Sequence, residues 1–322
     1  MIGIKHISSY LPEAVLGNEE LERRFPFPAG FLERKVGILE RRVAAADQST
    51  SDLALEAGRL LLGRTGLDPR DIDLVIVCTQ NPDYKLPHTA ALVQNGLGIP
   101  TTAAAFDISL GCSGFVYCLG LIQGWMQVHD SKNTLLFTCD PYSKVMNPED
   151  RSTVPIFSDA AAATWIGPDA TNHFGKPVFG TDGARYQALI VRNSGTREEP
   201  KASPYLHMDG RVIYEYMMRT VPTVVRQCLE ENGLSMEEID YFILHQASAH
   251  LLNGLRSKIG IPEHKLIQNL ARVGNTVSST IPIVLEELMA REDLSGKTLL
   301  LCGFGVGLSW GATVLTFSET TR

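Results

Sequence analysis

A cysteine between two glycines is the first candidate for chemistry in this sequence. Cys112 lies in the stretch ISLGCSGFVYCLGL, residues 108–121, where a strand-type run meets a helix-type run. Cysteine is among the residue types most often buried, so one interpretation is a thiol that only fills the core. The other is a nucleophile, because a helix N-terminus favours the thiolate and lowers the thiol pKa below its usual value of about 8.5.

A histidine and an asparagine far along the chain are candidate catalytic residues only in combination with this cysteine. His245 follows a short apolar run, and Asn275 follows Gly274 in a second tight turn. Taken singly, His245 is typical of a structural histidine and Asn275 of ordinary turn chemistry. Taken together, an imidazole N–H and an amide N–H₂ are donors of the kind that stabilise an enolate or an oxyanion.

An internal repeat indicates how these three residues meet. GLDPRDIDLVIVCTQNP and GLSMEEIDYFILHQASA share a Gly-Leu start, an Ile-Asp pair and an apolar strand that ends in polar residues. Their offset is about half the chain, which indicates duplication of one unit rather than a solenoid. In this alignment the turn at Cys112 corresponds to the turn at Asn275, and Cys78 corresponds to His245. A pseudo-twofold axis places equivalent turns on one side of an interface, so we expect the three side chains in one cleft.

The elements that must position these residues alternate between strands and helices. DLVIVCT, residues 73–79, is a continuous apolar run typical of a strand covered on both faces. SDLALEAGRLLLGRTG, residues 51–66, has helical spacing and ends at a glycine. We therefore expect two similar α/β halves, residues 1–170 with the cysteine and residues 171–322 with the histidine and the asparagine. The helix after Cys112 should be apolar on most faces and deeply buried.

Composition and charge exclude several classes of protein. The chain of 322 residues is 44% hydrophobic and 20% charged, which is typical of a soluble globular enzyme. A net charge of −7 argues against nucleic acid as the main partner. Residues 108–128 carry no charge, but their glycines and glutamines favour a buried central helix over a membrane span. The start MIGIKHISSYLP lacks the features of a secretory signal, so we expect a cytoplasmic protein.

Metal and disulfide chemistry are not indicated. The six cysteines include no CxxC pair, which favours reduced thiols over a disulfide framework or a zinc site. The motifs GxSxG, HExxH and the P-loop are missing from the sequence. His245 and His250 are spaced wrongly for two metal ligands on one helical face. We therefore expect no bound metal.

The whole chain resembles the thiolase superfamily and, within it, the β-ketoacyl-ACP synthase III enzymes that initiate type II fatty acid synthesis. The motifs that carry the resemblance are AFDISLGCSGF (105–115), PEDRSTVPIFSDAAAA (148–163), HQAS (245–248), GNTVSSTIP (274–282) and FGVGLSWG (304–311). The resemblance implies a thiolase-like α/β fold with two pseudo-twofold-related halves in five layers, αβαβα. It also implies a homodimer whose partners are acyl-CoA, malonyl-CoA or malonyl-ACP, and acyl carrier protein.

The resemblance further implies a two-stage reaction without a metal or redox cofactor. Cys112 first takes an acyl group from an acyl-CoA or an acyl-carrier thioester. A malonyl thioester then loses CO₂, while His245 and Asn275 stabilise the enolate. The enolate carbon attacks the acyl-cysteine and yields a β-ketoacyl thioester. The backbone N–H groups of Cys112 and of Val306, in the turn at 305–307, are implied to hold the oxyanion.

The implied substrate site departs from the family pattern in several positions. Arg151 matches one side of the family's clamp on the CoA adenine, but Phe31 stands where a tryptophan is usual. Leu86, in a loop that the family sends into the partner's acyl pocket, replaces an aromatic residue, whereas Phe157 keeps the usual aromatic wall. Further implied positions are Arg211 and Ser248 at the substrate and Arg256 and Lys258 at the carrier-protein docking surface, near His250, which replaces a common arginine. These changes suggest a specialised paralogue as readily as the housekeeping enzyme.

Two other functions stay open on the sequence. A non-condensing acyltransferase would move the acyl group from Cys112 to an alcohol or amine, with His245 as general base. A non-catalytic partner subunit would be expected to lose the cysteine, the histidine or the asparagine. Asn275 favours condensation, because a second enolate donor has a purpose only when a malonyl thioester is decarboxylated. A cysteine hydrolase is disfavoured, because nothing in the pattern presents water to an acyl-enzyme.

Overall fold

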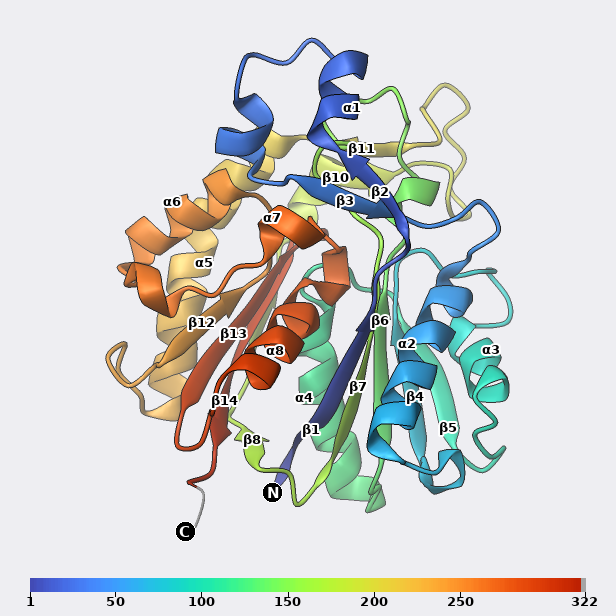
Figure 1. Ribbon diagram of the computed structural model, residues 1–322, viewed down its shortest axis with the longest axis vertical. Coiled ribbons are helices and arrows are strands. Elements are labelled where there is room, and N and C mark those ends of the chain that lie inside the picture. Colours follow the sequence, from blue (N-terminus) through green and yellow to red (C-terminus); the bar gives the residue numbers. More distant parts are fainter. Residues whose placement is uncertain (320–322) are drawn as a thin grey trace.

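The computed structural model describes residues 1–319 and contains two main β-sheets (Figure 1). The first sheet has the strand order β1-β7-β6-β4-β5. Its strands are β1 (Ile2–Tyr10), β4 (Leu74–Cys78), β5 (Ala104–Ile108), β6 (Thr134–Cys139) and β7 (Ala161–Pro168). β4 pairs in parallel with β5 and β6, and β7 runs antiparallel to β1 and β6. Every residue of β4 is buried, as its uninterrupted apolar run predicts.

The second sheet repeats this arrangement with residues of the second half. Its strands, in spatial order, are β12 (Tyr241–Leu244), β13 (Thr298–Gly305), β14 (Ser309–Phe317) and β8 (Asn172–Phe174), and β9 (Val178–Thr181) also pairs with β14. The β12–β13 pair is parallel and the β13–β14 pair antiparallel, like β4–β6 and β6–β7 in the first sheet. The predicted boundary at residue 170 lies between β7 and β8 and stays a prediction.

Helices form the three remaining layers (Figure 1). α4 (Gly114–His129) and α8 (Thr280–Arg291) lie between the two sheets, and their apolar side chains share one core with both. The outer helices are α2 (Thr50–Thr65) and α3 (Thr89–Gly96) on the first sheet, and α5 (Gly210–Asn232) and α6 (Ala249–Ile259) on the second. The fold is therefore the expected five-layered αβαβα arrangement, with each central helix beginning just after one of the two repeated turns.

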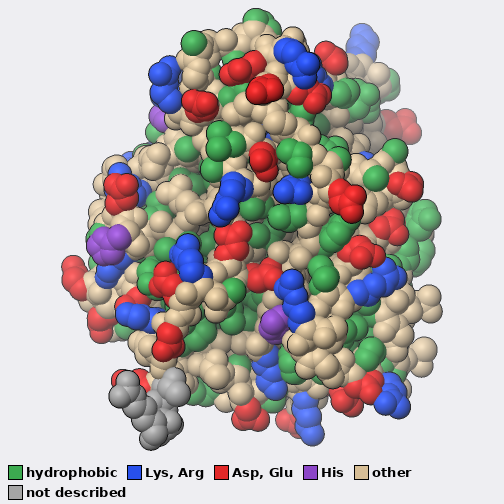
Figure 2. Space-filling model, in the orientation of Figure 1, with side chains coloured by type: hydrophobic (Ala, Val, Ile, Leu, Met, Phe, Trp, Pro, Cys, Tyr) green, Lys and Arg blue, Asp and Glu red, His purple; other side chains and the backbone are tan. Residues whose placement is uncertain are grey.

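The other elements form a cap over one end of the sheets (Figure 1). They are β2 (Ala14–Gly17), α1 (Asn18–Arg24), β3 (Glu40–Val43), β10 (Leu189–Val191), β11 (Leu206–Met208) and α7 (Leu270–Val273). Short helical turns lie at Leu32–Val36, Pro69–Asp71, Tyr142–Lys144, Gly183–Ala188, Glu263–Lys265 and Val277–Ser279. β2 pairs with β3 and β10 with β11, both antiparallel. Figure 2 shows acidic and basic side chains interspersed over the face of Figure 1, rather than gathered by sign.

Helix α4 departs from one expectation. Phe115, Leu119 and Ile122 are buried, but Leu121 and Val128 are 50% and 76% exposed. The prediction of deep burial is therefore wrong for the face that carries these two residues, because that face of α4 lies at the surface of the single chain. Within residues 1–319, no helix combines the length and hydropathy needed to cross a bilayer.

Candidate active site

Cys112 lies in the turn between β5 and α4, directly before Ser113, which is the N-cap of that helix. The expected strand–turn–helix elbow is thus present. The cysteine is 4% exposed, and β13 packs closely against it. A methyl group on Gly305 of β13 would come within 2.9 Å of the Cys112 sulfur, so only glycine permits this approach. A strand of the second sheet therefore forms one wall around a nucleophile of the first half.

Burial makes Cys112 a weaker acid than its elbow alone suggests. Loss of hydration raises the pKa of its thiol well above the usual value, and the nearby Asp140 carboxylate raises it further. The backbone N–H groups of Cys112 and Val306 hydrogen-bond to the sulfur and lower the pKa, but by less. The expectation of a lowered pKa is therefore wrong for the unacylated site, where Cys112 is a neutral thiol. These two N–H groups are the ones predicted to form the oxyanion hole.

Asp140 is a buried carboxylate beside the nucleophile that sequence reasoning missed. Its Oδ1 accepts the backbone N–H of Gln80 at 2.7 Å, and its Oδ2 accepts the Ser278 hydroxyl at 2.5 Å. Burial nevertheless raises its pKa to about 7. Asp140 directly follows β6, as His245 directly follows β12, so a search of polar residues at strand ends would have found both.

Removing this carboxylate should make the neighbouring thiol more acidic. Above pH 7 Asp140 is mostly ionised, so Asp140→Asn removes a negative charge and should lower the Cys112 pKa, speeding alkylation by iodoacetamide up to about tenfold, or one pKa unit. Below pH 7 the carboxyl is mostly neutral, and wild type and variant should react alike. Intact mass against time, measured across this pH range, follows the alkylation.

Asp159→Asn is the matched control for this measurement. Asp159 is also buried and also has a raised pKa, but it is not among the charges that raise the pKa of Cys112. Its variant should keep the wild-type alkylation profile. A profile of Asp140→Asn that coincides with wild type at all pH values would contradict the assigned coupling.

His245 lies just after β12, with its ring at the N-terminal end of α8. Its Nδ1 is 2.7 Å from the hydroxyl oxygen of Thr280, the first residue of α8. Burial lowers the pKa of His245 to about 3, so the ring is neutral and carries one N–H. Phe304 contacts the ring edge-on, with the ring centroids 5.5 Å apart. The side chain is thus held as a neutral imidazole.

Asn275 follows α7 through Gly274, whose φ of +75° lies in the region that favours glycine. A Cβ at Gly274 would also come within 2.7 Å of the Ser158 Cβ. The Oδ1 of Asn275 accepts the backbone N–H of Val277 at 3.0 Å. That bond fixes the amide so that its N–H₂ group, which lies 3.5 Å from the Ala247 carbonyl, is the end able to donate to a ligand.

One cavity of about 540 Å³ brings these three residues together. Cys112 comes from the first half, and His245 and Asn275 come from the second. Its walls are mostly apolar, and the exposed cationic side chains of Lys35 and Arg211 also contribute to the lining. A thiol and two hydrogen-bond donors therefore face one space that an acyl thioester can enter.

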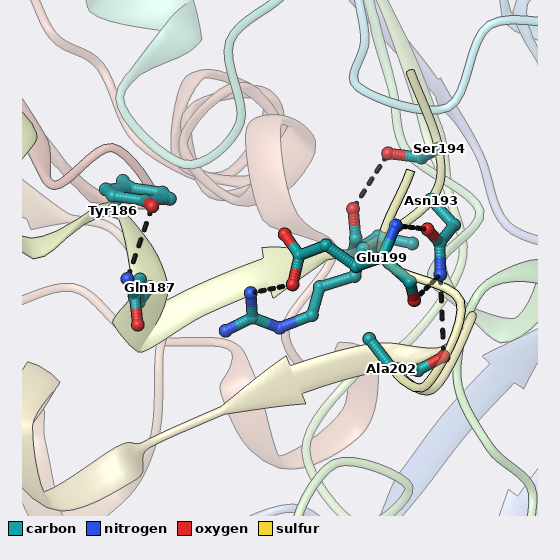
Figure 3. Close-up of polar contacts among 8 residues, drawn as sticks. Tyr186, Gln187, Asn193, Ser194, Glu199 and Ala202 are labelled. Atoms are coloured by element: carbon teal, nitrogen blue, oxygen red, sulfur yellow. Dashed lines mark hydrogen bonds and ion pairs between the residues drawn. The ribbon is translucent and has the colours of Figure 1, made fainter. Parts of the chain in front are cut away.

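The loop between β10 and β11 holds one wall of this cavity. Leu189 of β10 and Met208 of β11 are in the lining. Figure 3 shows the polar contacts that tie the loop together: Asn193 accepts the Glu199 backbone N–H at 2.6 Å and donates to the Glu199 carbonyl at 3.1 Å. The Arg192 guanidinium lies 2.8 Å from the Glu199 carboxylate. These contacts fix the segment that joins the two wall strands.

The expected substrate residues divide into two groups. Those in the cavity lining are Phe31, Phe157, Arg211 and Ser248. Arg151 lies exposed in a turn outside the lining, and Phe31 stacks on Phe27 at 5.4 Å. The pairing of Phe31 and Arg151 around an adenine ring stays a prediction. Leu86 is 88% exposed and also lies outside the lining.

Ser248, expected at the substrate, and the two residues expected at the carrier docking surface have contacts of their own. Ser248 is the N-cap of α6, and its hydroxyl accepts a backbone N–H of that helix at 3.3 Å. Arg256 is half-buried and lies 3.4 Å from the Glu263 carboxylate, whereas Lys258 is exposed. His250 lines the cavity and stacks on a tyrosine ring of α5, with centroids 4.9 Å apart. The docking role of Arg256 and Lys258 stays a prediction.

The fold and the cavity together define a class of protein, the thiolase-like enzymes that transfer acyl groups through a cysteine in a site shared by two halves. Comparison with known proteins narrows this class. Residues 106–183 match the family described as 3-oxoacyl-(acyl-carrier-protein) synthase III, and residues 229–317 match the family described as its C-terminal part. The chain belongs to the 3-oxoacyl-(acyl-carrier-protein) synthase III family of condensing enzymes.

Curated relatives and solved structures agree with this membership. The chain is 35% identical to the β-ketoacyl-(acyl-carrier-protein) synthase III of Streptococcus uberis over 319 residues, which are 97% of this chain and 98% of the relative. It is similar in structure to the synthase III of Thermus thermophilus, with 33% identity, a TM-score of 0.91 and coverage of 99% and 100% of the two chains. The priming β-ketosynthase of the R1128 polyketide pathway is 28% identical, with a TM-score of 0.91 and coverage of 99% and 97%.

Proposed function

We propose that Cys112, His245 and Asn275 together condense an acyl thioester with a malonyl thioester. The observation that carries the proposal is the shared cavity, in which a buried thiol faces two hydrogen-bond donors. A thiol alone would serve any acyl transfer. The second donor supports condensation, because the enolate released by malonyl decarboxylation needs stabilisation at its oxygen.

Acylation exchanges one thioester for another. The Cys112 sulfur bonds to the acyl carbon, the bond from that carbon to the donor sulfur breaks, and the Cys112 proton ends on the departing thiol. The N–H groups of Cys112 and Val306 hold the oxygen of the tetrahedral intermediate. The positive end of α4 favours the thiolate as it forms, so a thiol with a raised pKa still reacts.

Condensation begins when a malonyl thioester replaces the departed thiol. Its C–C bond to the carboxylate breaks, CO₂ leaves, and the electron pair forms an enolate. His245 Nε2–H and the Asn275 amide donate to the enolate oxygen. The enolate carbon bonds to the acyl carbon on Cys112, the C–S bond breaks, and a β-ketoacyl thioester leaves, while the Cys112 thiolate takes up a proton from water and returns to the thiol. The reaction takes up and releases no electrons overall, so it needs no redox cofactor.

We infer that the acyl donors are short, because bulky side chains pack in one buried cluster with the thiol. Tyr142, a residue that sequence reasoning missed, is 3% exposed and packs in the same buried cluster as Cys112. Its ring centroid lies 4.8 Å from that of Phe157, and its hydroxyl donates to the Gln80 Oε1 at 3.1 Å. Leu206 fills the same cluster. An acyl group of a few carbons fits this site better than a long chain.

Tyr142→Leu should therefore widen the range of acyl groups. The smaller side chain leaves space behind the thiol, so acylation of Cys112 by octanoyl-CoA should rise roughly tenfold relative to acetyl-CoA. Intact mass after incubation with each donor measures the ratio. Tyr142→Phe keeps the ring and should keep the wild-type preference. The same ratio in Tyr142→Leu and wild type would show that Tyr142 does not set the chain length.

A second copy of the chain completes the molecule in this proposal. β5 is an edge strand of the first sheet, and its Phe106 lies 5.8 Å from Trp125 of α4, next to the exposed Leu121 and Val128. Edge strands and exposed apolar groups of this kind are commonly covered by a partner. The exposed Leu86 loop is also available to such a partner. These observations support a homodimer.

The charges at the cavity and the free thiols support proposals for the substrate carriers and the cellular location. Lys35 and Arg211 supply positive charge at the cavity for the phosphate groups of CoA or of a carrier protein's prosthetic arm, although the chain as a whole is acidic. Acyl-CoA, malonyl-CoA or malonyl-ACP, and acyl carrier protein are therefore the proposed partners. All six cysteines are free thiols, which fits the reducing cytoplasm.

The proposed function is tested in two steps with one sample. The protein is first incubated with a panel of acyl-CoAs, and intact mass shows which acyl group attaches to Cys112. Malonyl-CoA or malonyl-ACP is then added, and CO₂ and the β-ketoacyl product are measured. Acylation followed by CO₂ release and product supports condensation. Acylation without CO₂ release would overturn it in favour of acyl transfer to another acceptor, and no acylation would contradict both.

A further inference from the structure

Within residues 1–319, the hydrogen-bond partner of His245 Nδ1 is a single hydroxyl, that of Thr280. Thr280 is 2% exposed, and its Oγ1 lies 2.7 Å from His245 Nδ1 and 3.2 Å from the Val277 carbonyl oxygen. The hydroxyl has one proton and two possible acceptors. The acceptor that receives the hydroxyl proton determines which nitrogen of the neutral His245 ring carries the ring proton.

Val277 connects this hydroxyl to the second donor of the site. Its φ of +55° is rare for a β-branched residue, and such strain persists only where the surroundings enforce it. In this conformation its N–H is donated to Asn275 Oδ1 at 3.0 Å, while its carbonyl reaches the Thr280 hydroxyl. One strained residue thus contacts the groups that orient both the amide and the imidazole.

The two arrangements of the hydroxyl have opposite consequences for the cavity. If Thr280 donates to the Val277 carbonyl, His245 Nδ1 must carry the ring proton, and Nε2 faces the cavity without a proton. If Thr280 donates to Nδ1, the ring proton lies on Nε2, where it can be donated to an enolate oxygen. The 2.7 Å contact is a hydrogen bond in both arrangements, and only the second leaves a proton on Nε2 for the enolate oxygen, as the proposed donor role of His245 requires.

We propose that Thr280 is a positioning residue, whose hydroxyl donates to His245 Nδ1 and holds the ring in the tautomer with its proton on Nε2. This inference rests on the proposed donor role of His245. It predicts that the hydroxyl matters for decarboxylation and condensation, which need the Nε2 proton, and not for acylation of Cys112, which uses the backbone N–H groups. A residue that only filled space would affect the two half-reactions equally.

The experiment compares wild type with Thr280→Val, which has nearly the same shape without the hydroxyl, and with Thr280→Ser, which keeps it. Thr280→Val should lower the rate of CO₂ release from malonyl-CoA by about 10- to 100-fold, which is somewhat less than the effect of removing a whole donor. It should change the rate of Cys112 acylation less than about threefold. Thr280→Ser should restore most of the decarboxylation. Thermal unfolding confirms that each variant is folded before its rates are compared.

Nitrogen-15 NMR of histidine-labelled protein gives a second readout. Wild type and Thr280→Ser should show His245, assigned by its loss in His245→Gln, with a protonated Nε2 and an unprotonated Nδ1. The opposite tautomer in wild type would overturn the proposal. So would a Thr280→Val variant that decarboxylates like wild type, or one that loses both half-reactions equally. Failure of the wild-type protein itself to release CO₂ would instead refute the condensing function.

Discussion

Cys112→Ala is expected to lose acylation and condensation completely. No acyl adduct should appear by intact mass with any acyl-CoA, and formation of β-ketoacyl product should fall by at least about 10⁴-fold, as is usual when a nucleophile is removed. His245 and Asn275 do not need the sulfur to hold an enolate. The variant should therefore still release CO₂ from malonyl-CoA and leave an acetyl thioester, because the enolate takes up a proton when no acyl group is present.

Cys118→Ala is the matched control for this experiment. Cys118 is fully buried in α4 only six positions along the chain, but it lies outside the cavity lining. Its variant should acylate and condense at the wild-type rate. An adduct on Cys112→Ala, or loss of the adduct in Cys118→Ala, would contradict the assignment of Cys112 as the nucleophile.

The position of the three residues in one cavity could be predicted because the sequence contains an internal repeat. Cys112 and Asn275 occupy equivalent turns of two similar units, and both turns lead into helices of the central layer, α4 and α8. Symmetry then places both turns beside the interface. His245 and Asp140 are not equivalent in this repeat, but each directly follows a buried strand, β12 and β6 respectively.

The acidity of the site could not be predicted, because it depends on packing between distant segments. A helix N-terminus is a local feature of the sequence, but the burial of Cys112 arises from the approach of Gly305 and from the Asp140 charge, and these outweigh the local effect. In the same way, the structure places Phe31 in the cavity lining, stacked on Phe27, and Arg151 in an exposed turn outside that lining. Spacing along the chain carries no information about such contacts.

Asn275→Ala is expected to separate the two half-reactions. The amide donates to the enolate oxygen, and loss of one donor of this kind typically costs about 10² to 10³ in rate. CO₂ release from malonyl-CoA and product formation should therefore fall by about that factor. Acylation of Cys112 should stay near the wild-type rate, because its oxyanion is held by the backbone N–H groups of Cys112 and Val306.

Asn275→Asp makes the test more specific. A carboxylate of the same shape can still accept the Val277 N–H through Oδ1, so the turn is preserved, but it offers no proton and places a negative charge beside the enolate. Decarboxylation should fall at least as far as in Asn275→Ala. Asn269→Ala is the control, because this amide precedes α7 and lies outside the cavity lining. If the amide served only the turn, aspartate would replace it without loss of activity. A wild-type rate of CO₂ release in Asn275→Asp would therefore disprove the donor role. It would also remove the main argument for condensation over simple acyl transfer.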